Sequence, residues 1–330
     1  MRTTKISPSS IRGHIYEELV NKLLTDAGFS TPPRTYQNPR IKMKGRSVNH
    51  QIDCIKSFPF TSPFSYPLRL LVEVKGWKGK VGTPSLMKFN SAVKDISEFG
   101  NREYKSDENV RTIRFGDHLI ERFIDVPAFV SLKGFSRSAE EYGMLNGMFL
   151  VSHSKTPQIL KILDDLKELI DSIQNFTVDL SKRDLAKKIL DPNSKLPNEL
   201  NSNETFMQKR DKVIRELNLL FALFGSIDGR VPVHLISENF VDLTKSGDII
   251  GRLDRLNGAI TLRLYEGDKE LFLASFTLPD FYLKYLTLHF SGKINSTRNV
   301  RFEPLRYISI YQKVSNKLQL FQVPIVSHPF

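Results

Sequence analysis

One short apolar run that carries two charges constrains the fold of this chain more than any other stretch. Its residues, 70–75, read Leu-Leu-Val-Glu-Val-Lys, and this short, β-branched composition predicts a buried strand. Side chains two apart on a strand point to the same face, so Glu73 and Lys75 emerge together from an apolar element. Burying charge is costly unless the charges are paired or bind a metal, which makes this strand a candidate for chemistry.

A third charged residue, Asp53, lies in a similar run earlier in the chain, Gln-Ile-Asp-Cys-Ile over residues 51–55. Two carboxylates can hold a hard divalent cation such as Mg²⁺, and that cation polarises a phosphodiester and lowers the pKa of a bound water. A neighbouring lysine positions the water or stabilises charge on the phosphate. The alternative is a structural Glu–Lys pair with an unrelated surface aspartate, which is favoured for an isolated match this short.

Composition and charge narrow the class of protein and its partners. The 330 residues predict two domains, and 40% hydrophobic with 25% charged residues is typical of a globular protein. No apolar run reaches membrane-spanning length and no signal-peptide core follows Met1, so we expect a cytoplasmic protein without a membrane partner. The single cysteine, Cys54, rules out an internal disulfide. The net charge of +12 favours a polyanionic partner, usually nucleic acid, and a merely basic protein is the alternative.

Helical and strand patterns alternate through the first half of the chain. Amphipathic spacing and capping residues predict helices over 10–28, from 83 onward, from 136 to 147 and over 156–173. Apolar runs predict strands around Asp53 and over 70–75, 127–135 and 148–151. This order predicts an α/β fold in which helices cover a mixed central sheet.

Three features near these strands have two interpretations each. Glu17, beside Tyr16 at the edge of the apolar stripe of the first helix, could face the sheet or be a solvated helix glutamate. His50 could contact a phosphate, but a local structural histidine is the favoured interpretation. The charged segment 97–125 is interpreted as an insertion that either faces a substrate or forms a solvated surface loop.

Four short segments occur in an order found in one enzyme family. They are Tyr16-Glu17 with Gly28-Phe29, then Gln51-Ile52-Asp53, then Glu73-Val74-Lys75 with Trp77 and Val81, and last the corner 134–142 running into 148–151. Together they resemble the Mrr-like restriction endonucleases, a branch of the PD-(D/E)XK nuclease superfamily, over residues 10 to 155. The chain departs from the family in two ways: members often carry Gln in place of Glu73, and the segment before residue 127 is longer than usual.

This resemblance implies a fold, a site and an activity. The fold is a restriction-endonuclease-like α/β/α core with a mixed sheet, in which Asp53 and Glu73 bind Mg²⁺, with Mn²⁺ as a substitute. Lys75 is then the catalytic lysine and Glu17 an accessory acid near the metal. The implied activity is hydrolysis of phosphodiester bonds in double-stranded DNA, in restriction or defence against foreign DNA. A homodimer is expected, because double-strand cutting usually needs two active sites. The alternatives are a DNA-binding module without turnover and a repair or recombination nuclease that cuts junctions.

The second half of the chain changes character after a polar segment. We assign 1–175 to the nuclease domain, 176–205 to a linker with a short helix over 181–190, and 206–330 to a β-rich domain. A helix over 206–223 is followed by strands over 231–236, 249–256, 259–265, 271–277, 282–290, 307–313 and 318–323, which predicts a mainly antiparallel β domain.

The basic residues of this β-rich domain have two interpretations. They could form a DNA-reading surface or be ordinary outward-facing strand residues: Arg252, Arg255, Arg263, Lys284, Lys293, Arg298, Arg301 and Arg306. Target recognition is the favoured role of the domain, with oligomerisation or partner docking as its rival.

Overall fold

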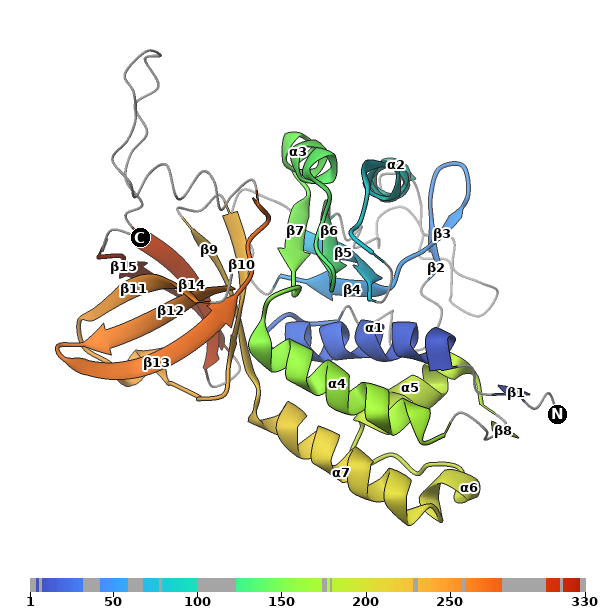
Figure 1. Cartoon of the computed structure of the whole chain (residues 1–330). Helices are drawn as coiled ribbons and strands as arrows, with labels where there is room; N and C mark the ends of the chain where they lie inside the picture. Colours follow the sequence, from blue (N-terminus) through green and yellow to red (C-terminus); the bar gives the residue numbers. More distant parts are fainter. Residues whose placement is uncertain are drawn as a thin grey trace, which may run out of the picture.

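The computed structural model of the chain describes residues 4–5, 8–31, 42–58, 68–76, 79–99, 123–173, 177–178, 180–227, 231–256, 259–280, 307–314 and 317–326. Figure 1 shows an α/β part, with helices on both sides of a sheet, next to a strongly curved β part. The strand expected at 282–290 and most of the insertion expected at 97–125 lie outside the described residues. Within the described residues, no helix has the length and apolarity needed to cross a membrane.

A mixed four-stranded sheet forms the centre of the α/β part. Its strands, in the order β4-β5-β6-β7, are Cys54–Ser57, Leu68–Lys75, Ile124–Ser131 and Phe149–Ser152. β4 runs antiparallel to β5, whereas β5, β6 and β7 are parallel to one another. The carboxyl ends of the three parallel strands therefore meet at one edge of the sheet, and Lys75 lies at this edge.

Helices cover both faces of this sheet, as the alternation of apolar residues along β5 requires. Leu70, Val72 and Val74 are buried in the core that contains the helices α1 (Pro8–Asp26) and α4 (Pro157–Asp171). Leu71 points the other way, into the core under α2 (Thr83–Phe99) and α3 (Arg137–Leu145). A strand buried on both faces is expected to be apolar at nearly every position, so the charges of Glu73 and Lys75 stand out. The predicted α/β/α core with a mixed sheet is confirmed.

A second helical layer packs against α1 and α4 (Figure 1). It consists of α5 (Lys182–Leu190), α6 (Asn198–Asn201) and α7 (Glu204–Leu219). Helices α5 and α6 come from the segment expected to be a linker, yet Leu185, Ile189 and Leu200 are buried in the same core as α1. This segment is therefore part of the packed structure, and the domain boundaries at 175 and 205 stay a prediction.

The β part is an antiparallel seven-stranded sheet that nearly closes into a barrel. Its strands β9 to β15 are Phe221–Ile227, Val231–Ser237, Ile249–Leu256, Ala259–Glu266, Lys269–Phe276, Tyr307–Val314 and Lys317–Pro324. They follow the order β11-β12-β13-β10-β9-β14-β15, and a bridge between Gly251 and Ile325 brings the two outer strands together. The predicted antiparallel β domain is confirmed.

The predicted helix over 206–223 is wrong at its end. Helix α7 stops at Leu219, and β9 begins at Phe221. The run from Leu217 to Leu223 is apolar enough to fit the residue spacing of either a helix or a strand. The pairing of β9 with both β10 and β14 decides in favour of the strand. Gly225 permits this close pairing, because a Cβ there would collide with the main-chain oxygen of Ser309 on β14.

Two small two-stranded sheets and one 3₁₀ turn complete the described fold. β1 (Thr4–Lys5) pairs with β8 (Thr177–Val178), and β2 (Lys42–Lys44) forms a hairpin with β3 (Asn49–Gln51). A 3₁₀ turn, η2 (Leu243–Lys245), follows β10. The hairpin leads directly into the Asp53 segment.

Candidate active site

Strand β5 brings Glu73 and Lys75 to the same face, as predicted. The Nζ atom of Lys75 donates a hydrogen bond to Oε1 of Glu73 at 2.5 Å. The side chain of Lys75 is 51% exposed and that of Glu73 is 20% exposed, so both remain open to a ligand at the sheet edge. A charged pair that is partly buried can still reach a ligand, and its charges interact more strongly than they would in bulk water.

Asp53 lies beside this pair. Cys54 of β4 is opposite Val72 of β5, so Asp53, in the bend just before β4, lies next to Glu73 of β5. The main-chain N–H of Val74 donates to Oδ2 of Asp53 at 2.9 Å, which holds this carboxylate against β5. The two acids expected to bind a metal therefore lie side by side at one edge of the sheet, Glu73 on β5 and Asp53 in the bend that precedes β4, not within a strand as expected.

Helix α1 contributes Glu17 from beneath the sheet. Its Oε2 atom is 3.0 Å from Nδ1 of His14, one turn earlier. The charge of Glu17 acts on the pKa of both Asp53 and Lys75, so this carboxylate faces the same site. Its neighbour Glu18 is oriented differently, with Oε1 3.7 Å from Nε of Arg183. The structure thus brings the four residues singled out from the sequence together.

The clustered acids shift the protonation of Asp53. Burial raises the pKa of Asp53, and the carboxylates of Glu73 and Glu17 raise it further. The amide of Val74 and the charge of Lys75 lower it, and the net pKa is about 7. Three carboxylates facing one ammonium leave an excess of negative charge, which favours a bound cation.

The same negative charges raise the pKa of Lys75 as well. Burial alone would lower its pKa, but the contact with Glu73 and the charges of Asp53 and Glu17 outweigh burial, and the pKa is raised. Lys75 therefore stays an ammonium at neutral pH. It can stabilise negative charge or donate hydrogen bonds, and it is not suited to accept a proton.

Two residues near the site, His14 and Arg183, were not predicted from the sequence. His14 is one, and its hydrogen bond to Glu17 raises its pKa more than burial lowers it. The spacing of His14 and Glu17 on one helix face was a usable signal. Arg183 is the other: its Nη2 donates to the main-chain oxygen of Asp53 at 2.9 Å. No local pattern connects Arg183 with Asp53, because 130 positions separate them.

His50 is a structural residue of the hairpin. Its Nε2 lies 2.7 Å from Oδ2 of Asp95 on α2. The same carboxylate accepts hydrogen bonds from the amide and the hydroxyl of Ser47, so Asp95 fastens the β2–β3 hairpin to α2. This agrees with the interpretation favoured from the sequence.

The corner after β6 supports the site from outside it. Val81 donates to the carbonyl of Gly134 at 2.9 Å and accepts from the amide of Ser136 at 2.9 Å. Ser136 also caps α3, because its Oγ accepts a hydrogen bond from the amide of Ala139. This corner, which resembles the family motif, anchors the segment that follows Lys75. Trp77 of the same motif lies outside the described residues.

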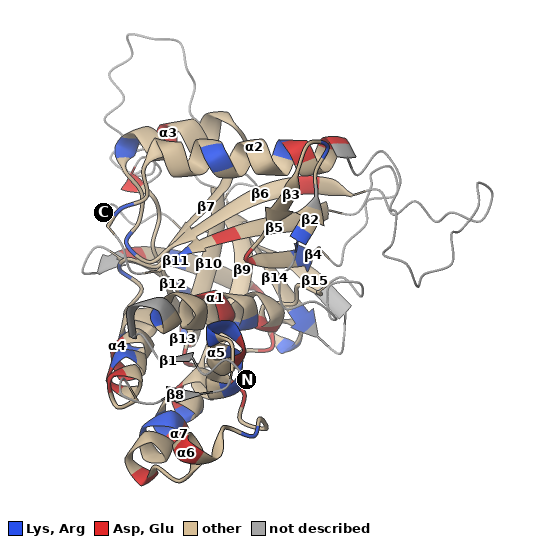
Figure 2. Cartoon of the chain, turned by 90° about the vertical axis from the view of Figure 1, so that its right-hand side faces the viewer, with Lys and Arg blue, Asp and Glu red and all other residues tan. Residues whose placement is uncertain are grey.

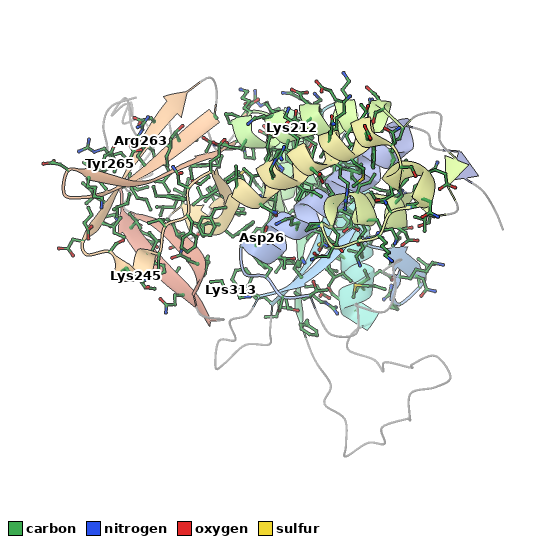
Figure 3. The ribbon with its side chains drawn as sticks, turned by 90° about the horizontal axis from the view of Figure 1, so that it is seen from below. Asp26, Lys212, Lys245, Arg263, Tyr265 and Lys313 are labelled. Carbon is green, nitrogen blue, oxygen red and sulfur yellow. The ribbon has the colours of Figure 1, made fainter. Side chains whose placement is uncertain are left out.

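Two of the basic residues of the β part, Arg263 and Arg252, contact other side chains of the sheet. Arg263 contacts Glu270 at 2.8 Å and Asp254 at 3.2 Å, and Arg252 stacks over the ring of Tyr265 at 4.7 Å. Figure 3 shows Arg263 and Tyr265 together on the outside of the β part, away from the helices. The side chain of Arg255 and the basic residues from 284 to 306 lie outside the described structure, so DNA reading by this part stays a prediction.

The donor chemistry of the site fits a hard divalent cation. Asp53 and Glu73 offer carboxylate oxygens. Burial and the neighbouring carboxylates both raise the pKa of Asp53, and a bound cation would offset both effects. In the part of the chain that the structure describes, no three or more His, Cys, Asp or Glu side chains are grouped so that they could hold a metal ion together. Mg²⁺ usually keeps several waters and takes only one or two protein carboxylates, so this pair meets its needs.

Comparison with known proteins gives a family for part of the chain. Residues 9–103 match a family model described as restriction endonuclease, the Mrr catalytic domain. The N-terminal region of this chain is therefore an Mrr-like nuclease region, and Glu17, Asp53, Glu73 and Lys75 all lie within the match.

The other comparisons add little. No curated protein matches the chain. A crystal structure of a protein of unknown function, AF1548, is 16% identical and covers 62% of this chain and 96% of its own. The TM-score of that superposition is 0.33, which is too low to support an inference.

Proposed function

We propose that this chain is a divalent-metal-dependent endonuclease that hydrolyses phosphodiester bonds of double-stranded DNA in restriction or defence against foreign DNA. The observation that carries this proposal is the placement of Asp53, Glu73 and Lys75 at one edge of the sheet, where the amide of Val74 holds the carboxylate of Asp53 at 2.9 Å and Lys75 contacts Glu73 at 2.5 Å. These residues lie in a region that matches a restriction endonuclease family model. The net charge of +12 suits a polyanionic substrate.

Asp53 and Glu73 would hold Mg²⁺, or Mn²⁺ in its place. When bound, the cation would neutralise the carboxylates, polarise the scissile phosphate and make a water more acidic. The chain prepares this site through the amide of Val74, which orients the carboxylate of Asp53. Glu17, held by His14, adds negative charge at the rim of the site.

Lys75 acts on the phosphate. Its ammonium is held by Glu73 at 2.5 Å and half exposed, so it can donate hydrogen bonds to a phosphate oxygen or to the attacking water. Its raised pKa keeps the positive charge in place while negative charge develops on the phosphate. The presence of both acids and the lysine argues against a DNA-binding module without turnover.

Nicking of a supercoiled plasmid tests the proposal. The full chain is expected to nick or linearise the plasmid with Mg²⁺ or Mn²⁺ and to stop when EDTA is added. Asp53→Ala and Lys75→Ala are each expected to lose activity by about 100-fold or more, since each removes a charge that acts in the transition state. Lys187→Ala, at an exposed position of α5, is the matched control and should retain activity.

Two results would contradict this assignment. One is activity that survives Asp53→Ala, and the other is activity that is indifferent to EDTA. A branched DNA tested beside the plasmid separates restriction-type cleavage from junction cleavage. We infer a homodimer for double-strand cutting, and the mass of the chain in solution with DNA, measured by light scattering, tests this inference.

A further inference from the structure

Arg183 reaches the candidate site from a segment outside the family match. It is the second residue of α5, whose N-cap, Ser181, accepts a hydrogen bond from the amide of Asp184. Arg183 extends from this helix start toward the sheet, and its side chain is only 17% exposed. Figure 2 shows α5 beside α1, the helix that carries Glu17 and Glu18.

The guanidinium of Arg183 binds the main-chain carbonyl of Asp53, a residue that lies outside the paired strands. β3 ends at Gln51 and β4 begins at Cys54, so Asp53 lies in the bend between two strands. A backbone carbonyl at such a position needs a hydrogen-bond donor, and Nη2 of Arg183 supplies one at 2.9 Å. Hydrogen bonds from a charged donor are about twice as strong as neutral ones, so the bend is held firmly.

A chain of contacts extends this hold to the next residue. Nε of Arg183 is 3.7 Å from Oε1 of Glu18, and Oε2 of Glu18 accepts from Asn21 at 3.5 Å. Asn21 in turn accepts a hydrogen bond from the thiol of Cys54 at 3.3 Å. Residues 53 and 54 are thus held from α1 and α5 together, one through its carbonyl and the other through its side chain.

We propose that Arg183 is a positioning residue that acts through the main chain of Asp53 and thereby sets the affinity of the site for a divalent cation. The inference rests on the proposed function for the identity of that ligand. It extends the working site from the matched region, 9–103, to helix α5. Residues that orient metal ligands typically contribute 10- to 100-fold to metal affinity or activity.

The test uses the full chain and Mg²⁺ or Mn²⁺ alone as the probe, with affinity measured by calorimetry. Arg183→Ala is expected to weaken binding by about tenfold or more, and Arg183→Lys by less, because an ammonium keeps a charged donor. Lys187→Ala removes one positive charge from an exposed position of the same helix, and its affinity should stay within about twofold of wild type. Plasmid cleavage by Arg183→Ala should recover as the Mg²⁺ concentration is raised.

If Arg183 only stabilises the fold, a different pattern of results is expected. If Arg183→Ala lowers the melting temperature but binds Mg²⁺ and Mn²⁺ with wild-type affinity, the inference is overturned and the proposed function is untouched. If the wild-type chain binds neither ion, the proposed function fails first. Should Arg183→Ala not fold, Glu18→Gln and Asn21→Ala loosen the same chain of contacts while keeping the guanidinium. Each is then expected to weaken metal binding several-fold, and unchanged affinity in both overturns the inference.

Discussion

Asp53 owes its protonation behaviour to burial and to the acids that lie near it. An isolated aspartate has a pKa near 3.8, and burial together with Glu73 and Glu17 raises that of Asp53 to about 7. A metal site needs such crowding, because carboxylates that repel one another gain most from a shared cation. The same crowding lowers the free energy of unfolding of the metal-free protein at neutral pH.

The stability of the metal-free protein should therefore report on Asp53. Between pH 4 and 7 the folded chain retains a proton on Asp53 that the unfolded chain has released, so unfolding becomes easier as pH rises. Relative to Asp53→Asn, the wild type should lose up to about 1.4 kcal/mol of unfolding free energy per pH unit in this window. Denaturant unfolding of both proteins in EDTA measures this difference.

The comparison with Asp53→Asn is needed because other groups titrate in the same range. Burial lowers the pKa of His153 and His234, so acid destabilises the fold through these two residues, while His14 acts in the opposite direction. The contributions of His153 and His234 cancel in the difference, and most of the His14 contribution does, because Asp53 is the last of the causes that shift the pKa of His14. Added Mg²⁺ above pH 7 should restore stability to the wild type and leave Asp53→Asn unchanged. A difference that is flat with pH would show that Asp53 titrates normally.

At the scale of elements, α7 holds the C-terminal end of α5. Arg210 of α7 is buried, and it donates hydrogen bonds to the carbonyls of Lys188, Ile189 and Asp191 at 3.1, 3.1 and 2.6 Å. These carbonyls lie at the C-terminal end of α5, where helix carbonyls lack partners within the helix. The helix that carries Arg183 is thus held at its far end by one side chain.

Arg210→Met should destabilise the chain by about 2–4 kcal/mol, because it leaves buried carbonyls without a donor. Arg215→Met, at an exposed position of the same helix, is the control and should change stability by less than about 0.5 kcal/mol. Thermal unfolding measures both variants. Equal stability of the two variants would mean that water replaces Arg210 at little cost.

At the scale of the whole molecule, the α/β and β parts share one core. Residues from α1, α4, α5 and α7 are buried together with Ala222 and Phe224 of β9 and Ile236 of β10. A polar chain crosses the same boundary: the hydroxyl of Tyr16 is 3.0 Å from Nδ1 of His153, whose Nε2 is 3.0 Å from Nδ1 of His234. Parts joined in this way are expected to unfold together.

Calorimetry of the metal-free chain should therefore show one cooperative transition. Phe224→Ala should shift this transition to lower temperature without splitting it, at a cost of about 3–5 kcal/mol, because Phe224 packs against Phe29 with ring centroids 5.2 Å apart. Two resolved transitions in the wild type would instead support independent domains with boundaries near 175 and 205.

Local chemistry in the sequence was enough for much of the fold and for singling out Glu73 and Lys75, whereas Glu17 was a candidate only through the family resemblance. The alternation in β5 indicated which side chains share a face, Pro84 marked the first turn of α2, and Ser136 marked the start of α3. The same alternation isolated Glu73 and Lys75 in an apolar strand. These features depend on residues within a few positions of one another, so a single segment encodes them.

Packing between distant segments decided the rest. The start of β9, the near closure of the barrel and the path of α5 across the site follow from partners far away in the chain. Arg183 has no local sign of its role, because its hydrogen bond to Asp53 exists only once α5 packs on α1. The pKa of Asp53 likewise depends on burial and on charges that arrive from a strand and a helix, and no pattern along the chain records those distances.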